Sequence, residues 1–293
     1  MGDWLRLYGP PLFAWALVVG RLIGPYRFDT FERRAILVCL TGVACTVTTT
    51  SPLGYLAIGD LTHIPNVARP LGHFSMLVVV SATWALMLSL SNPNSHWKSP
   101  WRTWWLLATV AAMTVAFILS DTPENNIHFA SDYGDSPWVL EYWLIYISYL
   151  LPVYVILFRL TRRYAQLSAR RSLRIGLHVI TVGIVISAIY HVHKAVYFAA
   201  LRFGWDYPAW LREPVDKYAT VISMVLVLAG LTLPSWTWRA VMWLRQYRTY
   251  HRLGPLWRSL HAATPEIALS TAGFIESRLP RDLGLRLYRR VIE

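Results

Sequence analysis

Long apolar segments recur along the chain at a length that suits membrane-spanning helices. A helix needs about 20 mostly apolar residues to cross the hydrocarbon core of a bilayer. Seven segments before residue 238 meet this requirement: 8–25, 35–58, 67–91, 102–120, 138–158, 174–201 and 215–237. The first is the weakest, because Pro10, Pro11 and Arg21 crowd its ends. We therefore predict an all-α integral membrane protein whose seven-helix transmembrane domain covers residues 1–237.

The composition agrees with a fold that has lipid as its solvent. Charged residues make up 15% of the chain and hydrophobic residues 55%, whereas a soluble domain carries about 25% charged residues. Trp and Tyr gather near the expected span boundaries, for example at Trp101, Trp138 and Trp236. Their amphipathic rings favour the headgroup layer, so this placement supports the predicted boundaries.

The distribution of basic residues predicts the orientation. Of the 28 lysines and arginines, 22 follow the first, third, fifth and seventh segments, and acidic residues collect in the other loops. Loops rich in Lys and Arg stay on the cytoplasmic side. We therefore expect a multi-pass protein of the plasma membrane with its N-terminus outside and its C-terminus in the cytoplasm. An even number of spans would break the alternation.

The segment 238–293 differs from the rest because arginines and aromatic residues alternate in it. Trp243, Tyr247 and Tyr250 recur at helical spacing. The accompanying arginines are Arg245, Arg248, Arg252 and Arg258. This pattern predicts a basic amphipathic cytoplasmic tail that lies on anionic membrane lipids or docks onto a cytoplasmic protein partner. We expect no nucleic acid as a partner, because the tail is short and carries no recognised binding motif.

Several segments resemble an actinobacterial family of multi-pass membrane proteins. Its members are labelled as transporters and end in a domain of unknown function. The segments are "IPNVARPLGHF" at 64–74, "DYGDSPW" at 132–138, "LTLPSW" at 231–236, "YRTYHRLGPLWRSLHAATPEIALS" at 247–270 and "RDLGLRLYRRVIE" at 281–293. Members of the family usually continue beyond the segment that resembles "RLYRRVIE". The resemblance implies a membrane domain followed by a cytoplasmic domain, truncated here, and it implies no activity.

Polar residues inside the predicted spans are the candidates for a functional site, since they are costly in a bilayer. Tyr190, His191 and Lys194 share one face of the sixth span with Ser187. His73 in the third span, Thr48 in the second and Glu141 in the fifth are candidates at a similar depth. We predict that these residues form a polar cavity that takes a small polar or anionic ligand from the outer face. The protein would then be receptor-like or transporter-like.

Other interpretations of the same residues remain open. Lys194 could extend to the outer headgroups while the histidines bond neighbouring helices. If Lys194 stays buried instead, Glu141 and Asp216 are the nearest counter-charges by depth. A membrane enzyme acting on a lipid or isoprenoid substrate is the alternative function, and a structural partner subunit is a third.

A metal site or a cofactor is not expected. His191 and His193 with His73 are weak candidates for metal ligands, because an HxH pair on a helix points its rings to different sides. The chain contains neither GxGxxG nor GxSxG, so no dinucleotide loop or nucleophile elbow supports an enzyme.

Overall fold

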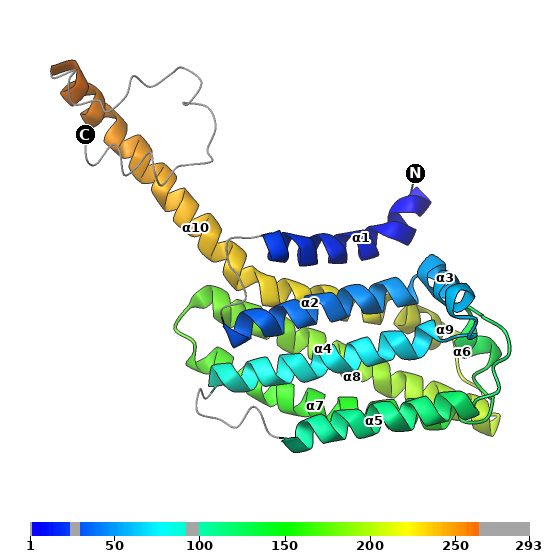
Figure 1. Ribbon diagram of the computed structural model, residues 1–293. Helices are drawn as coiled ribbons and strands as arrows, with labels where there is room; N and C mark the ends of the chain where they lie inside the picture. The colour runs from blue at the N-terminus through cyan, green and yellow to red at the C-terminus, as the bar shows by residue number, and fades with distance from the viewer. Residues whose placement is uncertain (1, 24–29, 92–99, 264–293) are drawn as a thin grey trace. The chain divides into compact units, whose positions relative to one another are not determined.

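The computed structural model describes residues 2–23, 30–91 and 100–263, and within these ranges all regular structure is helical. The helices are α1 (Gly2–Ile23), α2 (Phe31–Thr50), α3 (Pro52–Thr62), α4 (Ala68–Ser91), α5 (Pro100–Leu119), α6 (Phe129–Asp132), α7 (Val139–Leu167), α8 (Arg171–Phe203), α9 (Ala209–Pro214), the π-helix η1 (Val215–Ala219) and α10 (Thr220–Ala263) (Figure 1). The chain divides into two compact units, Met1–Leu231 and Thr232–Glu293.

Several helices have the length and apolar character of membrane spans, which confirms the prediction of an all-α membrane protein in its general form. Among the described residues four helices qualify: α4, α5, α7 and α8. The pair α2 and α3 qualifies as a fifth if the two are counted together. The segments Tyr8–Ile23 and Thr220–Leu233 are apolar but shorter. The number of seven spans and the orientation stay predictions.

The predicted second span, 35–58, is not one straight helix. It breaks at Ser51, where α2 ends and α3 begins, and the two helix axes differ by 84°. Pro52 has no N–H to continue the hydrogen bonds of α2, and it suits the first turn of a new helix. The Ser51 hydroxyl accepts a hydrogen bond from the Gly54 amide at 3.2 Å and thereby caps α3. Sequence and capping together explain the bend.

Helices α2, α4, α5, α7 and α8 run side by side in the first unit (Figure 1). Helix α4 packs against both α2 and α7, and α7 packs in turn against α5 and α8. Fully buried Leu77, Met113 and Leu150 fill the centre. A Cβ atom added to Gly183 of α8 would lie 3.0 Å from the Ser223 carbonyl oxygen of α10, so this glycine allows the two backbones to approach closely. Small residues at such crossings are typical of membrane helices.

Asn66 joins two connections at one end of this unit. It is fully buried between α3 and α4 and has a positive φ of 59°, a conformation that Asn tolerates better than most residues. The Nδ2 atom of its side chain donates to the Glu124 carbonyl oxygen at 2.8 Å. Its Oδ1 atom accepts from the Tyr55 hydroxyl at 2.8 Å and from the Asn126 amide at 2.9 Å. One side chain therefore links the α3–α4 connection to the segment that follows α5.

The described part of the second unit, 232–263, continues α10 as a helix. Trp243 stacks on Tyr247 with ring centroids 5.3 Å apart, and Tyr247 contacts His251 at 4.3 Å. The arginines that we predict to bind lipid or a partner are exposed: Arg245, Arg248, Arg252 and Arg258. The division of the chain into a transmembrane domain and a tail at 237/238 stays a prediction, and the tail beyond residue 263 lies outside the described residues.

Candidate functional site

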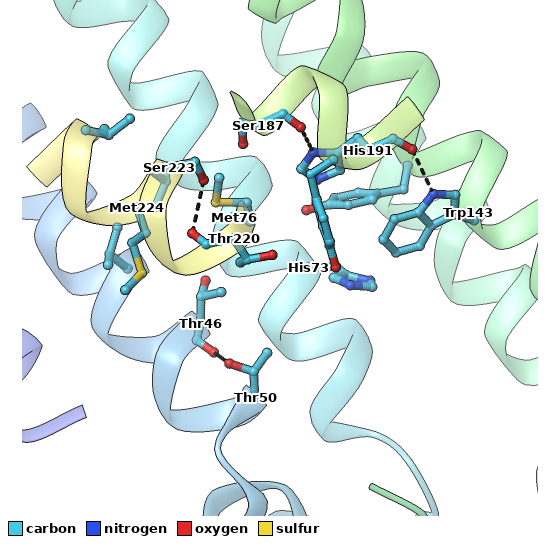
Figure 2. Close-up of a pocket in the computed structure, with 15 residues that line it drawn as sticks. Thr46, Thr50, His73, Met76, Trp143, Ser187, His191, Thr220, Ser223 and Met224 are labelled. Carbon is cyan, nitrogen blue, oxygen red and sulfur yellow. Dashed lines mark hydrogen bonds between the residues drawn. The ribbon is translucent and has the colours of Figure 1, made fainter. Parts of the chain in front are cut away.

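A pocket of about 140 Å³ lies among five helices of the first unit (Figure 2). Its walls come from α2, α4, α7, α8 and the beginning of α10. The lining residues are Val43, Thr46, Thr50, His73, Met76, Val79, Trp143, Tyr146, Ser187, Tyr190, His191, Thr220, Ser223, Met224 and Val227. Most of this surface is apolar, and two imidazoles and several hydroxyls interrupt it. None of the lining side chains is a carboxylate, an ammonium or a guanidinium.

His191 is held in one tautomer by its own helix. Its Nδ1 atom lies 2.6 Å from the Ser187 carbonyl oxygen, one turn earlier on α8 (Figure 2). Because a carbonyl oxygen only accepts hydrogen bonds, Nδ1 carries the proton. In the neutral imidazole Nε2 is then an unprotonated acceptor, and no described residue donates a hydrogen bond to it. His191 lines the pocket, and its Nε2 atom is a hydrogen-bond acceptor for which the described residues show no donor.

Aromatic rings hold the His191 imidazole in place. Trp143 of α7 stacks on it nearly parallel, with centroids 6.0 Å apart and planes 14° apart. Tyr154 and Tyr190 contact it edge-on at 5.6 and 5.2 Å. Such ring contacts add to the burial energy of each side chain. The imidazole thus has little freedom to rotate.

His73 reaches the same pocket from α4. Its Nδ1 atom lies 2.8 Å from the Tyr142 hydroxyl, and its ring stacks on Tyr146 with centroids 4.5 Å apart. The Tyr146 ring also contacts His191, at 5.5 Å. Both histidines therefore line one cavity and share Tyr146 as a packing partner.

Three of the hydroxyls in the pocket donate to backbone carbonyls. Thr46 donates to the Gly42 carbonyl at 2.9 Å, and Thr50 donates to the Thr46 carbonyl at 2.7 Å. Ser223 donates to the Thr220 carbonyl at 3.0 Å (Figure 2). A hydroxyl that donates in this way keeps lone pairs with which to accept. These groups therefore add further acceptors to the pocket wall.

Lys194 is not among the lining residues. Its Nζ atom lies 2.7 Å from Asp216 Oδ2 in η1, and its side chain is 8% exposed against 31% for Asp216. Asp216 is one of the two carboxylates that the sequence suggested as a counter-charge. Lys194 follows His191 by three residues, about 4.5 Å further along the helix axis, so its charged end meets a different layer of the bundle.

The remaining predicted site residues occupy different positions. Tyr190 lines the pocket. Thr48 does not: its hydroxyl donates to the Ala44 carbonyl at 2.7 Å and accepts from Trp15 Nε1 at 3.0 Å. Glu141 is half-buried in the first turn of α7, and its Oε2 atom is buried without a hydrogen-bond partner among the described residues. The structure thus brings His73, Tyr190 and His191 together, and it places the other three candidates outside the pocket wall.

Sequence reasoning did not find Met76, Trp143 and Tyr146 as lining residues. Met76 follows His73 by three positions, and Tyr146 follows Trp143 by three, so each pair shares a helix face. That spacing was visible in the sequence. It could not be distinguished from an ordinary core face, because apolar and aromatic residues also pack helices together.

The weak metal candidates do not converge. His193 turns away from the pocket: its Nδ1 atom bonds the Tyr207 hydroxyl at 2.6 Å, and its Nε2 atom lies 3.8 Å from Asp216 Oδ1. Burial and the nearby Asp216 carboxylate raise the pKa of the Tyr207 hydroxyl, which lies in the connection after α8. Across the described residues, no three His, Cys, Asp or Glu side chains come together as a metal site would require.

Comparison with known proteins finds one family. Residues 242–293, less than a fifth of the chain, match a family of unknown function, DUF6545. This match fits the predicted C-terminal domain of unknown function. No curated protein matches the chain, and no solved structure does.

Proposed function

We propose that the protein binds a small uncharged molecule in the pocket between α2, α4, α7, α8 and α10, as a receptor-like or transporter-like membrane protein. The observation that carries this proposal is the unused acceptor at His191 Nε2. A ligand with an N–H or O–H group would donate to this atom, and its apolar part would contact Met76, Trp143 and Tyr146. The contacts that fix the tautomer of His191 would also fix the direction of the hydrogen bond.

The absence of charge in the lining favours a neutral ligand over an anionic one. Burying an ion without a counter-charge is costly in a low-dielectric site, and Lys194 is already paired with Asp216. The volume of the pocket narrows the class of ligands further, because an apolar cavity of about 150 Å³ accommodates a benzene ring. The ligand is therefore of the size of one aromatic ring and carries a hydrogen-bond donor.

We also propose that the chain crosses the membrane seven times, with its N-terminus outside. The two shorter apolar segments and the bent pair of α2 and α3, added to the four long helices, give this number of spans. In this arrangement Lys194, near the end of α8, belongs to the outer half of the bundle. The alternating charge of the loops supports the orientation.

Phenol and benzene provide a direct test with the protein in lipid nanodiscs. They have nearly the same shape, and only phenol can donate a hydrogen bond. We expect phenol to raise the unfolding temperature more than benzene, because a ligand that binds the folded state stabilises it. One hydrogen bond contributes about 0.5–1.5 kcal/mol, which corresponds to roughly a twofold to tenfold difference in affinity.

The variant His191→Phe removes the acceptor and keeps an aromatic ring. It should abolish the difference between phenol and benzene. His178→Phe is the matched control, since His178 is an exposed histidine on the same helix, and it should behave like the unmodified protein. An equal effect of phenol and benzene on the unmodified protein would refute the role assigned to His191.

A further inference from the structure

The two histidines that line the pocket differ in what their Nδ1 atoms contact. His191 Nδ1 lies 2.6 Å from the Ser187 carbonyl oxygen, which only accepts hydrogen bonds. His73 Nδ1 lies 2.8 Å from the Tyr142 hydroxyl, which can donate as well as accept. The two imidazoles therefore need not carry their protons on the same nitrogen.

The Tyr142 hydroxyl fixes the tautomer of His73. Tyr142 is buried, and in the part of the chain that the structure describes His73 Nδ1 is the one hydrogen-bond partner of its hydroxyl. If Nδ1 carried the proton, the hydroxyl would accept and its own hydrogen would be buried without an acceptor, which is costly. The hydroxyl therefore donates to Nδ1. The proton of a neutral His73 ring then lies on Nε2.

The surroundings of His73 favour the neutral ring. The imidazole contacts three aromatic rings of α7, those of Tyr142, Trp143 and Tyr146. No described carboxylate forms an ion pair with it, and a buried imidazolium without a counter-charge would be costly. His73 Nε2 is therefore an N–H donor, and the described residues show no acceptor for it.

The two imidazoles are close enough for one small molecule to contact both. The Tyr146 ring packs against each of them, with centroids 4.5 Å from His73 and 5.5 Å from His191. The two imidazole centroids are therefore at most the sum of these distances apart, 10.0 Å. A small ring that makes a hydrogen bond of about 2.9 Å at each end can bridge this separation. Both histidines lie in the wall of the same pocket (Figure 2).

The imidazoles select a ligand more strictly than the hydroxyls around them. A Ser, Thr or Tyr hydroxyl turns about its C–O bond and can serve as a donor or as an acceptor. An imidazole nitrogen whose tautomer is fixed serves as only one of the two. The pocket wall thus combines an acceptor at His191 with a donor at His73.

We propose that His73 is the specificity-determining donor of the pocket, and that the ligand is a small neutral ring with both a hydrogen-bond donor and an acceptor, such as an azole or a lactam. This inference rests on the proposed function, since it concerns the same pocket. The N–H group of the ligand donates to His191 Nε2, and its ring nitrogen or carbonyl oxygen accepts from His73 Nε2. A ring with only one of these groups leaves one imidazole unpaired and binds less tightly.

Pyrazole and pyrrole test this assignment with the protein in nanodiscs. Both are neutral five-membered rings with an N–H group, and only pyrazole has a second nitrogen that accepts. His73→Phe removes the donor and keeps a ring to stack on Tyr146. The ratio of pyrazole affinity to pyrrole affinity should be about twofold to tenfold higher in the unmodified protein than in His73→Phe. His178→Phe, at the exposed histidine of α8, is the matched control and should leave the ratio unchanged. An equal ratio in His73→Phe and the unmodified protein would overturn the inference.

The tautomer itself can be measured without a ligand. Nitrogen NMR of the unmodified protein with labelled histidine should show His73 protonated at Nε2 and bare at Nδ1, the reverse of His191. Loss of the signal in His73→Phe assigns it, or loss in His73→Gln if the first variant does not fold. A proton on His73 Nδ1 would overturn the inference.

The outcome for His73 is separate from the outcome for the proposed function. In His73→Phe phenol should still bind more tightly than benzene, because His191 still provides the acceptor. If the preference for phenol holds in the unmodified protein while pyrazole gains nothing from His73, the proposed function stands and the role of His73 as a donor is wrong. If phenol and benzene bind equally to the unmodified protein, the proposed function itself is wrong.

Discussion

Asn66 offers the most direct test of how the end of the first unit is held together, through the variant Asn66→Ala. The side chain makes three hydrogen bonds shorter than 3.0 Å, to Glu124, Tyr55 and Asn126. Each bond contributes about 0.5–1.5 kcal/mol, and the buried partners would be left unsatisfied. The positive φ adds about 1 kcal/mol, because alanine adopts this conformation less readily than asparagine. The expected loss is therefore about 3–5 kcal/mol.

Thermal unfolding in nanodiscs measures this loss, with Tyr55→Phe for comparison. That variant removes one of the three bonds and keeps the ring, so it should cost about 1 kcal/mol. Thr62→Ala, at the exposed end of α3, serves as the control and should change little. If Asn66→Ala unfolds within a degree of the unmodified protein, or if Tyr55→Phe costs as much as Asn66→Ala, the side chain does not link the two connections as described.

Three further predictions concern topology, the tail and helix packing. A reporter fused after Glu293 should be active only in the cytoplasm and one inserted at 121–137 only outside, and the reverse result at either point would exclude the seven-span arrangement. Changing Arg245, Arg248, Arg252 and Arg258 together to Gln should weaken binding to anionic vesicles by about 1 kcal/mol per residue; if binding is unchanged, a protein partner becomes the better interpretation of this surface. Gly183→Leu should lower the unfolding temperature more than Val182→Leu on the exposed side of α8, since a side chain at position 183 would meet the Ser223 carbonyl; equal effects would contradict the close crossing.

The apolar helices could be predicted from the sequence, because the hydrophobicity of a 20-residue window is enough to identify a candidate membrane span. The break at Ser51 was harder to place, since Pro52 permits either a kink within one span or the start of a new helix. The pattern also predicted the meeting of His73 and His191, because depth along two spans was enough to bring them to one level.

Other parts of the site depend on tertiary contacts that no local pattern contains. Lys194 shares a helix face with His191, which led us to expect it in the cavity. Depth along the spans had indicated Asp216 as a counter-charge, but Asp216 lies in a π-helical turn that no local sequence pattern predicts. Thr48 was expected to line the cavity, yet Thr46 and Thr50 do so, because the rotation of α2 relative to α4 is set by packing at Gly42 and Val79.

The central claim is that His191 Nε2 is a hydrogen-bond acceptor available to a ligand. Nitrogen NMR of the protein in nanodiscs with labelled histidine observes both ring nitrogens of His191 directly. We predict that Nδ1 is protonated and Nε2 is not, and that added phenol shifts the Nε2 resonance toward the value of a hydrogen-bonded nitrogen while benzene leaves it unchanged. His191→Phe assigns the signal by its loss. A protonated Nε2 in the free protein, or an Nε2 resonance that does not respond to phenol, would contradict the account.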